Sequence, residues 1–286
     1  ALVFDVQDVG SRYYTYVYTM ALAMKAAARA GIPFFVLDRP NPIGGELVEG
    51  NLVGKKYRSF VGLYELPTRH GMTAGELARL INTREKFGAA LTVVPCEGLK
   101  RTNTWADTGR AFVPPSPNMP TPDTALVYPG MCLGEGTNVS EGRGTCRPFE
   151  QFGAPWLRSD EVAGALNELK LPGVTFRPCA FTPTFDKFRG ESCEGAFIHV
   201  TDPKRFEPVR TGLAVFSTCH ALGGKKFRWR DDAYEFVDDV PAFDLLCGTD
   251  QVRRGIEAGA GLDRLMRGFD EQLRAFFPTR RAFLIY

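Results

Sequence analysis

The sequence predicts an α/β protein in which a Rossmann-like, mostly parallel sheet with helices is joined to a smaller C-terminal α+β domain. Short apolar runs of strand length alternate with segments whose apolar residues recur at helical spacing, which is typical of β-α-β units. Polar clusters follow the first two predicted strands, where parallel sheets bind ligands. The texture of the chain changes after residue 152, so we expect a first domain over residues 1–152 and a second over residues 153–286.

The first β-α-β unit occupies the N-terminal part of the chain. Leu2–Val6 has the composition of a buried strand, and Pro33–Leu37 has that of a second one. Between them, apolar residues recur at helical spacing over Tyr16–Ala27, and Gly31 follows as a C-cap. We expect a right-handed crossover between two parallel strands. Leu91–Pro95 is predicted as a third strand.

A long connection and a well-marked helix lie between the second and third strands. Gly44–Leu66 exceeds the usual loop length and indicates a lid, a hairpin or a domain edge. Thr73 and Glu76 form a capping box, so a helix begins at Thr73. His70 stands just before this N-terminus, where helices bind anions, and its alternative role is purely structural.

The second half of the chain contains further helix and strand signals. The expected helices are Ser159–Leu169, Pro208–His220, Thr249–Ala258 and Leu262–Phe277, and the expected strands are Val174–Phe181 and Ala196–Val200. The segment Pro178–Glu194 contains an irregular stretch that indicates a surface hairpin, with Asp186 and Arg189 as the side chains able to reach a cleft.

Composition excludes several classes of function. The 286 residues are 44% hydrophobic and 24% charged, with a formal net charge of +2, as in globular proteins without a basic surface for nucleic acid. No apolar run approaches the roughly 18–20 residues of a membrane span. The seven cysteines form no C-x-x-C pair and there are three histidines, so we expect scattered thiols, no metal centre and no cofactor.

The strongest candidate for a functional loop is Tyr128–Glu150. It holds five glycines, three carboxylates and two arginines, with almost no apolar periodicity. Glycines let the backbone turn sharply and approach a ligand, and they would present Glu135, Glu141 and Arg143. The alternative is a solvated surface loop.

Polar residues after the two strands supply further candidates. The first cluster contains Asp5, Asp8 and Arg12, and the second contains Asp38, Arg39 and Asn41. In a parallel sheet the two clusters are neighbours at one edge. The alternatives are a helix cap at Asp8, an ion pair at Asp38 and Arg39 that fixes the turn, and a rigid turn at Asn41. A stiff Pro-rich stretch, Pro114–Pro120, places Asn118 either at the same crevice or in a plain spacer.

The motifs resemble those of the NamZ-type exo-β-N-acetylmuramidases, a family formerly called a domain of unknown function. The resemblance rests on FDVQDVGSRYYTYVYTM, VLDRPNPIGG, RHGMTAGELA, PPSPNMPTPDTALVYPG, EGTNVSEGRGT and PFEQFGAPW, and it extends to the C-terminal FLIY. It implies a Rossmann-like domain and a smaller domain with the active site between them. It also implies release of N-acetylmuramic acid from the non-reducing end of peptidoglycan fragments, in cell-wall recycling, by a bacterial protein that is extracellular or periplasmic.

One family motif does not occur here. The resemblance implies a G-P-E-H-G motif, whose Glu is the favoured catalytic acid, in an N-terminal segment of the family. This chain opens at Ala1 within its first strand, and three strands make a thin sheet. We therefore expect that it begins downstream of that motif and that further strands precede it, or else that another carboxylate does the work.

Glycoside hydrolysis usually takes two carboxyl groups, so acidic residues lead the list of candidates. The catalytic candidates are Glu135, Glu141, Asp5 and His70. The substrate-binding candidates are Asp8, Arg12, Tyr14, Asp38, Arg39, Asn41, Asn118, Asn138 and Arg143. Among these, an arginine would grip the lactyl carboxylate of muramic acid, the amides would hold hydroxyl or acetamide groups, and the tyrosine would contact the ring.

Three rival functions remain open. In the first of these, the chain is a binding module that holds muramyl sugars without catalysing their hydrolysis. A nucleotide-binding oxidoreductase is disfavoured because no G-x-G-x-x-G follows the first strand. A divalent-cation site would use Asp5, Asp8 and Glu135, which all carry hard oxygen ligands.

Overall fold

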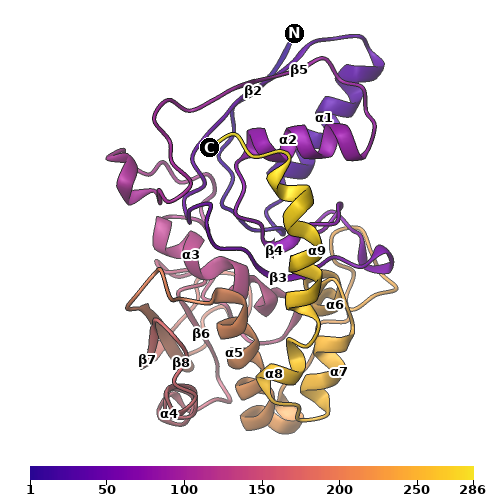
Figure 1. The fold of residues 1–286 in the computed structure, drawn as a ribbon. Coiled ribbons are helices and arrows are strands. Elements are labelled where there is room, and N and C mark those ends of the chain that lie inside the picture. Colours follow the sequence, from indigo (N-terminus) through magenta and orange to yellow (C-terminus); the bar gives the residue numbers. More distant parts are fainter.

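The computed structural model describes residues 1–286 and shows a mixed α/β fold (Figure 1). Strands β1 (Leu2–Phe4), β2 (Phe34–Leu37) and β5 (Leu91–Val94) form a parallel sheet in the order β1-β2-β5. Helix α1 (Tyr16–Arg29) connects the first two strands. The predicted β-α-β unit and the third parallel strand are therefore confirmed.

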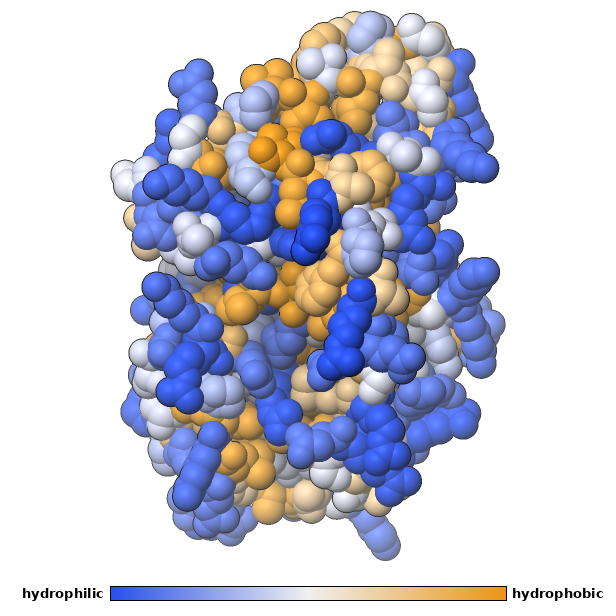
Figure 2. Space-filling view, in the orientation of Figure 1, coloured by the Kyte–Doolittle hydropathy of each residue, from blue (hydrophilic) through white to orange (hydrophobic).

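Two helices cover one face of this sheet. Helix α1 packs against α2 (Ala74–Arg84), and both contact the strands. The capping box at the start of α2 is confirmed, because the Thr73 side chain accepts from the Glu76 N–H while the Glu76 carboxylate accepts from the Thr73 N–H. The opposite face of the sheet is more open, and apolar side chains reach the surface in the upper part of the molecule (Figure 2).

The long connection after β2 contains one strand of a small two-stranded sheet. Strands β3 (Glu49–Leu52) and β4 (Pro67–Arg69) pair antiparallel, with the short 3₁₀ helix η1 (Lys55–Tyr57) between them. The C-terminal helix α9 (Phe269–Arg281) packs along β3. This connection is therefore a domain edge rather than a free lid.

The second part of the chain is built on an antiparallel sheet. Strands β6 (Gln151–Ala154), β7 (Val174–Phe181) and β8 (Cys193–Val200) pair in the order β6-β8-β7. Helices α4 (Ser159–Glu168) and α5 (Pro208–Gly223) pack beside it. The remaining elements are η2 (Ala106–Thr108), α3 (Pro122–Met131), η3 (Cys132–Gly136), η4 (Gly224–Lys226), α6 (Ala242–Cys247), α7 (Gln251–Glu257) and α8 (Leu262–Leu265). None of the helices has the length and apolar character needed to cross a membrane.

Two sequence expectations about helices were wrong. The segment from Tyr128 was expected to be irregular, but α3 continues through Pro129 to Met131, capped by Thr121 with Pro122 as its first residue. The stretch Leu262–Phe277 was expected to be one helix, but Gly268 adopts a left-handed conformation with φ 85° and divides it into α8 and α9.

The two hydrophobic cores interlock. Helix α3 and the glycine-rich loop pack into the larger core together with α5 and the second sheet, so by packing they belong with the C-terminal part. That core also includes Val9, Tyr13 and Ile43 from the N-terminal part. In return, α9 crosses back to the first core, where Phe276 is buried (Figure 1). A boundary after residue 152 stays a prediction, and packing favours one nearer to residue 121.

Candidate active site

Two glycines shape the loop that carries the predicted carboxylates. Gly142 and Gly144 have φ of 78° and 79°, a left-handed conformation that favours glycine. The loop closes where the Phe149 N–H donates to the Glu141 carbonyl oxygen at 2.6 Å. The side chains of Glu141 and Arg143 are therefore fixed by a rigid backbone rather than by a solvated loop.

Glu135, Glu141 and Arg143 form one ion-pair network, which the sequence placed in one loop. Arg143 donates to Glu135 through Nη2, and its Nε lies 3.2 Å from Glu141 Oε1. Lys187 Nζ donates to Glu141 Oε2 at 2.8 Å, and the Tyr234 hydroxyl donates to Glu135 Oε2 at 2.6 Å. We call these five residues the carboxylate network.

Lys187 and Tyr234 were missed by the sequence reasoning. Lys187 lies in the connection between β7 and β8, where Asp186 and Arg189 were the expected contributors. A Cβ on Gly144 would overlap the Phe185 backbone, so this glycine admits the connection, and Thr184 N–H then donates to the Gly144 carbonyl at 2.9 Å. The irregular composition of the segment was the available signal, but it did not identify the lysine.

The side chains of the carboxylate network differ in their solvent exposure. The side chains of Glu141, Glu135 and Arg143 are 2%, 14% and 26% exposed. Burial alone would lower the pKa of Arg143, but the Glu135 and Glu141 carboxylates outweigh it and raise that pKa. Burial and the Glu135 carboxylate raise the pKa of Tyr234 well above its usual value, so this phenol stays protonated and donates. Arg143 and Glu135 thus form the face available to a ligand.

A second polar cluster surrounds Asp8 and His70. The His70 Nδ1 accepts from the Met72 N–H at 3.2 Å, which leaves the proton on Nε2, 3.5 Å from Asp8 Oδ2. Gly10 N–H also donates to that Asp8 oxygen at 2.8 Å. Five of the ten buried side-chain polar atoms without a hydrogen-bond partner belong to this region: Gln7 Oε1, Asp8 Oδ1, Ser11 Oγ, Tyr14 Oη and His70 Nε2. Such a concentration at one place indicates polar groups arranged for a ligand.

An aromatic layer joins the two clusters. The Tyr14 and Tyr128 ring centroids lie 6.1 Å apart, and those of Tyr128 and Phe149 lie 4.8 Å apart. The Arg143 guanidinium stands 5.2 Å above the Phe149 ring. The predicted residues Tyr14 and Arg143 are therefore linked through Tyr128 and Phe149, and at the other end the Asp8 carboxylate acts electrostatically on the Tyr14 hydroxyl.

Arg12 is engaged elsewhere. Its Nη1 donates to the carbonyl oxygens of Asn51 and Leu66 at 2.6 and 2.9 Å, and its Nη2 donates to those of Leu246 and Cys247 at 2.9 and 3.1 Å. The side chain is 1% exposed. The expected grip on a substrate carboxylate is not supported, because both terminal nitrogens already bind the protein and join its two halves.

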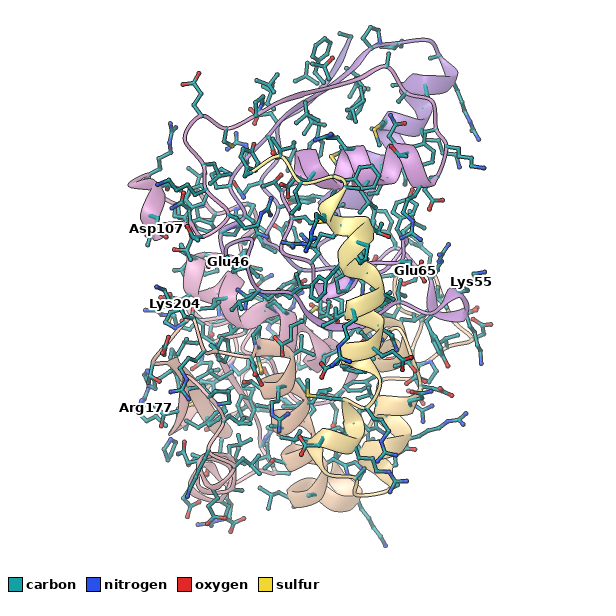
Figure 3. The ribbon with its side chains drawn as sticks, in the orientation of Figure 1. Glu46, Lys55, Glu65, Asp107, Arg177 and Lys204 are labelled. Atoms are coloured by element: carbon teal, nitrogen blue, oxygen red, sulfur yellow. The ribbon has the colours of Figure 1, made fainter.

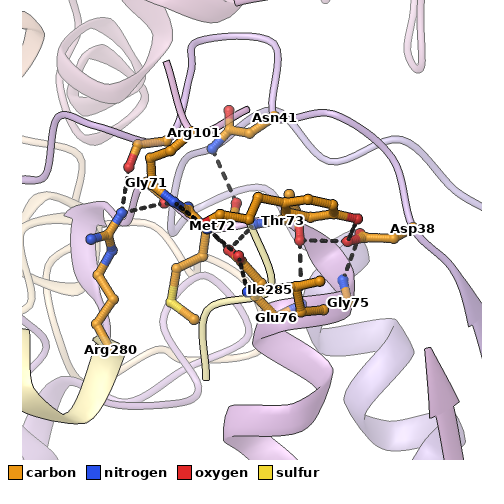
Figure 4. A network of polar contacts seen from close by, with 12 residues as sticks. Asp38, Asn41, Gly71, Met72, Thr73, Gly75, Glu76, Arg101, Arg280 and Ile285 are labelled. Carbon is orange, nitrogen blue, oxygen red and sulfur yellow. Dashed lines mark hydrogen bonds and ion pairs between the residues drawn. The ribbon is translucent and has the colours of Figure 1, made fainter. Parts of the chain in front are cut away.

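Asp38 and Asn41 also serve the fold. Asp38 accepts from Thr73 Oγ1 at 2.7 Å, Gly75 N–H at 2.8 Å and Tyr286 Oη at 2.8 Å, so it holds the start of α2 and the C-terminal tail (Figure 4). Burial raises the pKa of Asp38. The Asn41 Nδ2 donates to the Met72 carbonyl at 3.1 Å and its Oδ1 accepts from Ile43 at 3.2 Å. Both expected crevice residues are instead occupied within the protein.

The remaining candidates lie at the surface or within loops. Asp5 pairs with Arg39 at 2.7 Å, with side chains 47% and 40% exposed, so Arg39 forms an ion pair with Asp5 and not the expected one with Asp38. The Asn138 amide pairs with the backbone of Lys226 and Arg228 at 2.8 Å each. Asn118 is half-buried and its side-chain amide has no hydrogen bond within the protein. Of these four, Asn118 is the one whose side chain makes no hydrogen bond or ion pair within the protein.

The ligands proposed for a cation are also committed to other partners. Asp5 is paired with Arg39, Asp8 faces His70, and Glu135 is bound by Arg143. No group of three or more His, Cys, Asp or Glu side chains is placed to hold a metal ion. The structure therefore gives no support to the cation-site alternative.

The largest cavity lies between the two halves of the molecule. A cavity of about 730 Å³ separates the two halves and is lined by Ile43, Glu46, Arg69, Asp107 and Lys204, of which Glu46, Asp107 and Lys204 are seen together in Figure 3. None of the predicted site residues lines it. The carboxylate network is thus not at the bottom of the largest hollow, contrary to the usual expectation for an active site.

Comparisons with known proteins identify one similar sequence and two similar crystal structures. A peptidoglycan β-N-acetylmuramidase NamZ from Bacillus subtilis is 50% identical over 285 residues, which is 100% of this chain and 67% of the relative. Two crystal structures of DUF1343 family proteins from Bacteroides fragilis superpose with TM-scores of 0.89 and 0.76, at 33% and 31% identity. Each match covers 100% of this chain and 74% or 75% of the solved chain.

Two family descriptions match consecutive parts of the chain. Residues 1–123 match "Exo-beta-N-acetylmuramidase NamZ, N-terminal" and residues 126–286 match "Exo-beta-N-acetylmuramidase NamZ, C-terminal". The division falls at the start of α3, a helix that packs into the larger core. Because the two matches together cover nearly the whole chain, the protein belongs to the NamZ family of exo-β-N-acetylmuramidases.

Proposed function

We propose that this protein is a glycoside hydrolase that releases N-acetylmuramic acid from the non-reducing end of peptidoglycan fragments. A relative that is 50% identical over the whole chain is named as a peptidoglycan β-N-acetylmuramidase, which supports the reaction class. The observation that carries the assignment on this chain is the carboxylate network, where two carboxylates and two cations meet beside an aromatic layer.

The roles within the network follow from exposure and bonding. Arg143 Nη1 has no partner in the protein, so it is the donor we assign to the lactyl carboxylate of muramic acid. Glu135 is the more exposed carboxylate and acts on the reacting centre, with Tyr234 holding its second oxygen. Glu141 is buried between Arg143 and Lys187, so it positions the arginine rather than touching substrate.

A second acid–base group is required for hydrolysis, and Asp8 is the best placed. Its carboxylate is held by the Gly10 N–H and faces the His70 imidazole, while its other oxygen has no partner. We propose that the Asp8 and His70 pair supplies this group, which in glycosidases stands within about 9.5 Å of its partner carboxylate. Tyr14, between the two clusters, contacts the sugar ring.

One observation favours a second function, a binding module without catalysis. Both oxygens of Glu135 and both oxygens of Glu141 are already engaged by Arg143, Tyr234 and Lys187, so neither carboxylate is free. Hydrolysis of a chromogenic β-glycoside of N-acetylmuramic acid separates the two readings. We expect release of the chromophore, and saturable binding without release would establish the binding module instead.

We further propose that the parallel sheet is the core of a Rossmann-like domain and that the protein works in the extracellular space or the periplasm. The β1-α1-β2 unit with parallel pairing supports the first proposal, and a peptidoglycan substrate supports the second. Fractionation of the producing cells tests the location, which would be wrong if the protein were found with cytoplasmic markers alone.

A further inference from the structure

The turn Tyr234–Val237 carries the most exposed large apolar side chain of the molecule. Phe236 is 95% exposed, and no other large apolar side chain exceeds 75%. A single exposed apolar side chain is common on protein surfaces, so a role for Phe236 must rest on its backbone conformation and its neighbours.

The backbone at this position is unfavourable for the residues it carries. Tyr234 and Val237 exchange two N–H···O bonds at 2.8 and 3.0 Å, which defines a two-residue hairpin. Between them, Glu235 and Phe236 have φ of 47° and 69°. Turns of this kind normally use Asn-Gly or Gly-Gly, because glycine reaches positive φ without a steric penalty. Stability therefore does not explain the phenylalanine.

The same turn is attached to the carboxylate network. The Tyr234 hydroxyl donates to Glu135 Oε2 at 2.6 Å, and the Arg230 N–H donates to the Gly136 carbonyl at 2.9 Å. Burial raises the pKa of Glu235, and the Glu135 carboxylate raises it further, so the tip of the turn lies within electrostatic reach of the network. Phe236 follows directly after this residue.

A second hairpin tip supports the Phe236 ring from the N-terminal half. Ser59 and Gly62 exchange N–H···O bonds at 3.4 and 3.0 Å, which places Phe60 at the tip. The Phe60 and Phe236 centroids lie 6.5 Å apart with their planes at 69°, and the 95% exposure of Phe236 leaves its ring open to a ligand. Phe60 is itself held against Tyr18, at 6.3 Å.

We propose that Phe236, supported by Phe60, binds the sugar ring on the leaving-group side of the cleaved bond. This inference rests on the proposed function. An enzyme that removes the terminal residue holds one sugar on the non-reducing side, so any further sugar lies on the leaving-group side. A pyranose presents a face of C–H groups that packs against an aromatic ring, and Phe236 offers such a face at the edge of the network that holds the terminal residue.

Kinetics with two substrates test the proposal. The first is the disaccharide of N-acetylmuramic acid β-linked to N-acetylglucosamine, and the second is the methyl β-glycoside of N-acetylmuramic acid, which has no sugar as its leaving group. Phe236→Ala should lower kcat/KM for the disaccharide by about 3- to 10-fold. It should leave the methyl glycoside unaffected, and Phe236→Trp should keep the wild-type values for both.

Two controls separate binding from folding. Phe236→Gly relieves the backbone strain, so it should keep or raise the melting temperature while losing the same disaccharide preference. Phe277→Ala removes a phenylalanine that is 40% exposed on α9 and should change neither substrate. Equal losses on both substrates, or no loss on either, would overturn the role of Phe236.

A binding readout keeps this test separate from the test of hydrolysis. Saturation-transfer NMR with the disaccharide reports which ring lies against the protein. If wild-type protein hydrolysed neither substrate, the proposed function would fail. Saturation transfer to the N-acetylglucosamine protons that disappears in Phe236→Ala would still support the binding of this sugar by Phe236. Transfer that persists unchanged in the variant would refute it.

Discussion

Replacing Arg12 by methionine separates a structural clamp from a substrate-binding arginine. The guanidinium is 1% exposed and donates to four carbonyl oxygens, two from the β3 and β4 region and two from the end of α6. The Cys247 oxygen keeps a second donor, Asn51 Nδ2 at 2.8 Å, so about three oxygens lose their partner. Each buried unpaired oxygen costs about 1–3 kcal/mol, and removing the buried charge returns part of it, so we expect a net loss near 3 kcal/mol.

Thermal and urea unfolding provide the assay for this loss. For a chain of this size, about 3 kcal/mol corresponds to a melting temperature lower by roughly 6–12 °C. The matched control is Arg158→Met, because Arg158 is 65% exposed in a surface ion pair whose removal should leave the melting temperature unchanged. KM should stay within about twofold of wild type in Arg12→Met. An unchanged melting temperature together with a strongly raised KM would refute the clamp and restore Arg12 as a substrate ligand.

Three other perturbations follow from the structure. Burial raises the pKa of Glu49 from 4.5 to about 7, so the stability of the protein should fall by about 2 kcal/mol between pH 5 and pH 8, and Glu49→Gln should flatten this slope in pH-dependent unfolding. A Cβ at Gly130 would overlap the Pro208 carbonyl where α3 crosses α5, so Gly130→Ala should lower the free energy of unfolding in urea by about 3 kcal/mol. A Cβ at Gly164 in α4 meets open space, so Gly164→Ala should raise that free energy by about 0.5–1 kcal/mol. Glu76→Gln breaks the buried ion pair with Arg101 and the bond to the C-terminal tail, so it should cost about 3–5 kcal/mol and increase hydrogen exchange in the tail (Figure 4). No slope at Glu49, equal effects of the two glycine variants, or an unchanged tail would contradict the respective argument.

The elements that the sequence predicted well depend on local spacing. The β1-α1-β2 unit, the capping box at Thr73 and Glu76, and the strand Val174–Phe181 all have their cause within a few residues. The elements that were missed combine conflicting local signals. Helix α3 contains Pro129 and Gly130, which disfavour a helix, and it is stabilised by packing against α5, a contact between segments distant in sequence.

The sequence predicted the loop that carries the candidate site, but it did not predict the residues from other segments that contact this loop. Glu135, Glu141 and Arg143 stand within nine residues of one another, so composition alone placed them together. Lys187 and Tyr234 contact the same carboxylates from 46 and 99 residues away in the sequence. No pattern of spacing in the sequence predicts contacts over such separations. Arg12 shows the converse: a guanidinium binds backbone carbonyls and ligand carboxylates by the same donors, so the residue type could not tell which partner it has.

The most direct test of the account is the turnover of Glu135→Gln on the muramyl disaccharide. Because Glu135 is assigned to the reacting centre while Asp5 is only paired with Arg39 at the surface, the Asp5→Asn variant is the matched control. We expect kcat to fall by about 10²- to 10⁴-fold in Glu135→Gln, measured at a temperature where the variant is fully folded, and to stay unchanged in Asp5→Asn. Turnover by Glu135→Gln at half the wild-type rate, or an equal loss in Asp5→Asn, would contradict the assignment of the carboxylate network as the active site.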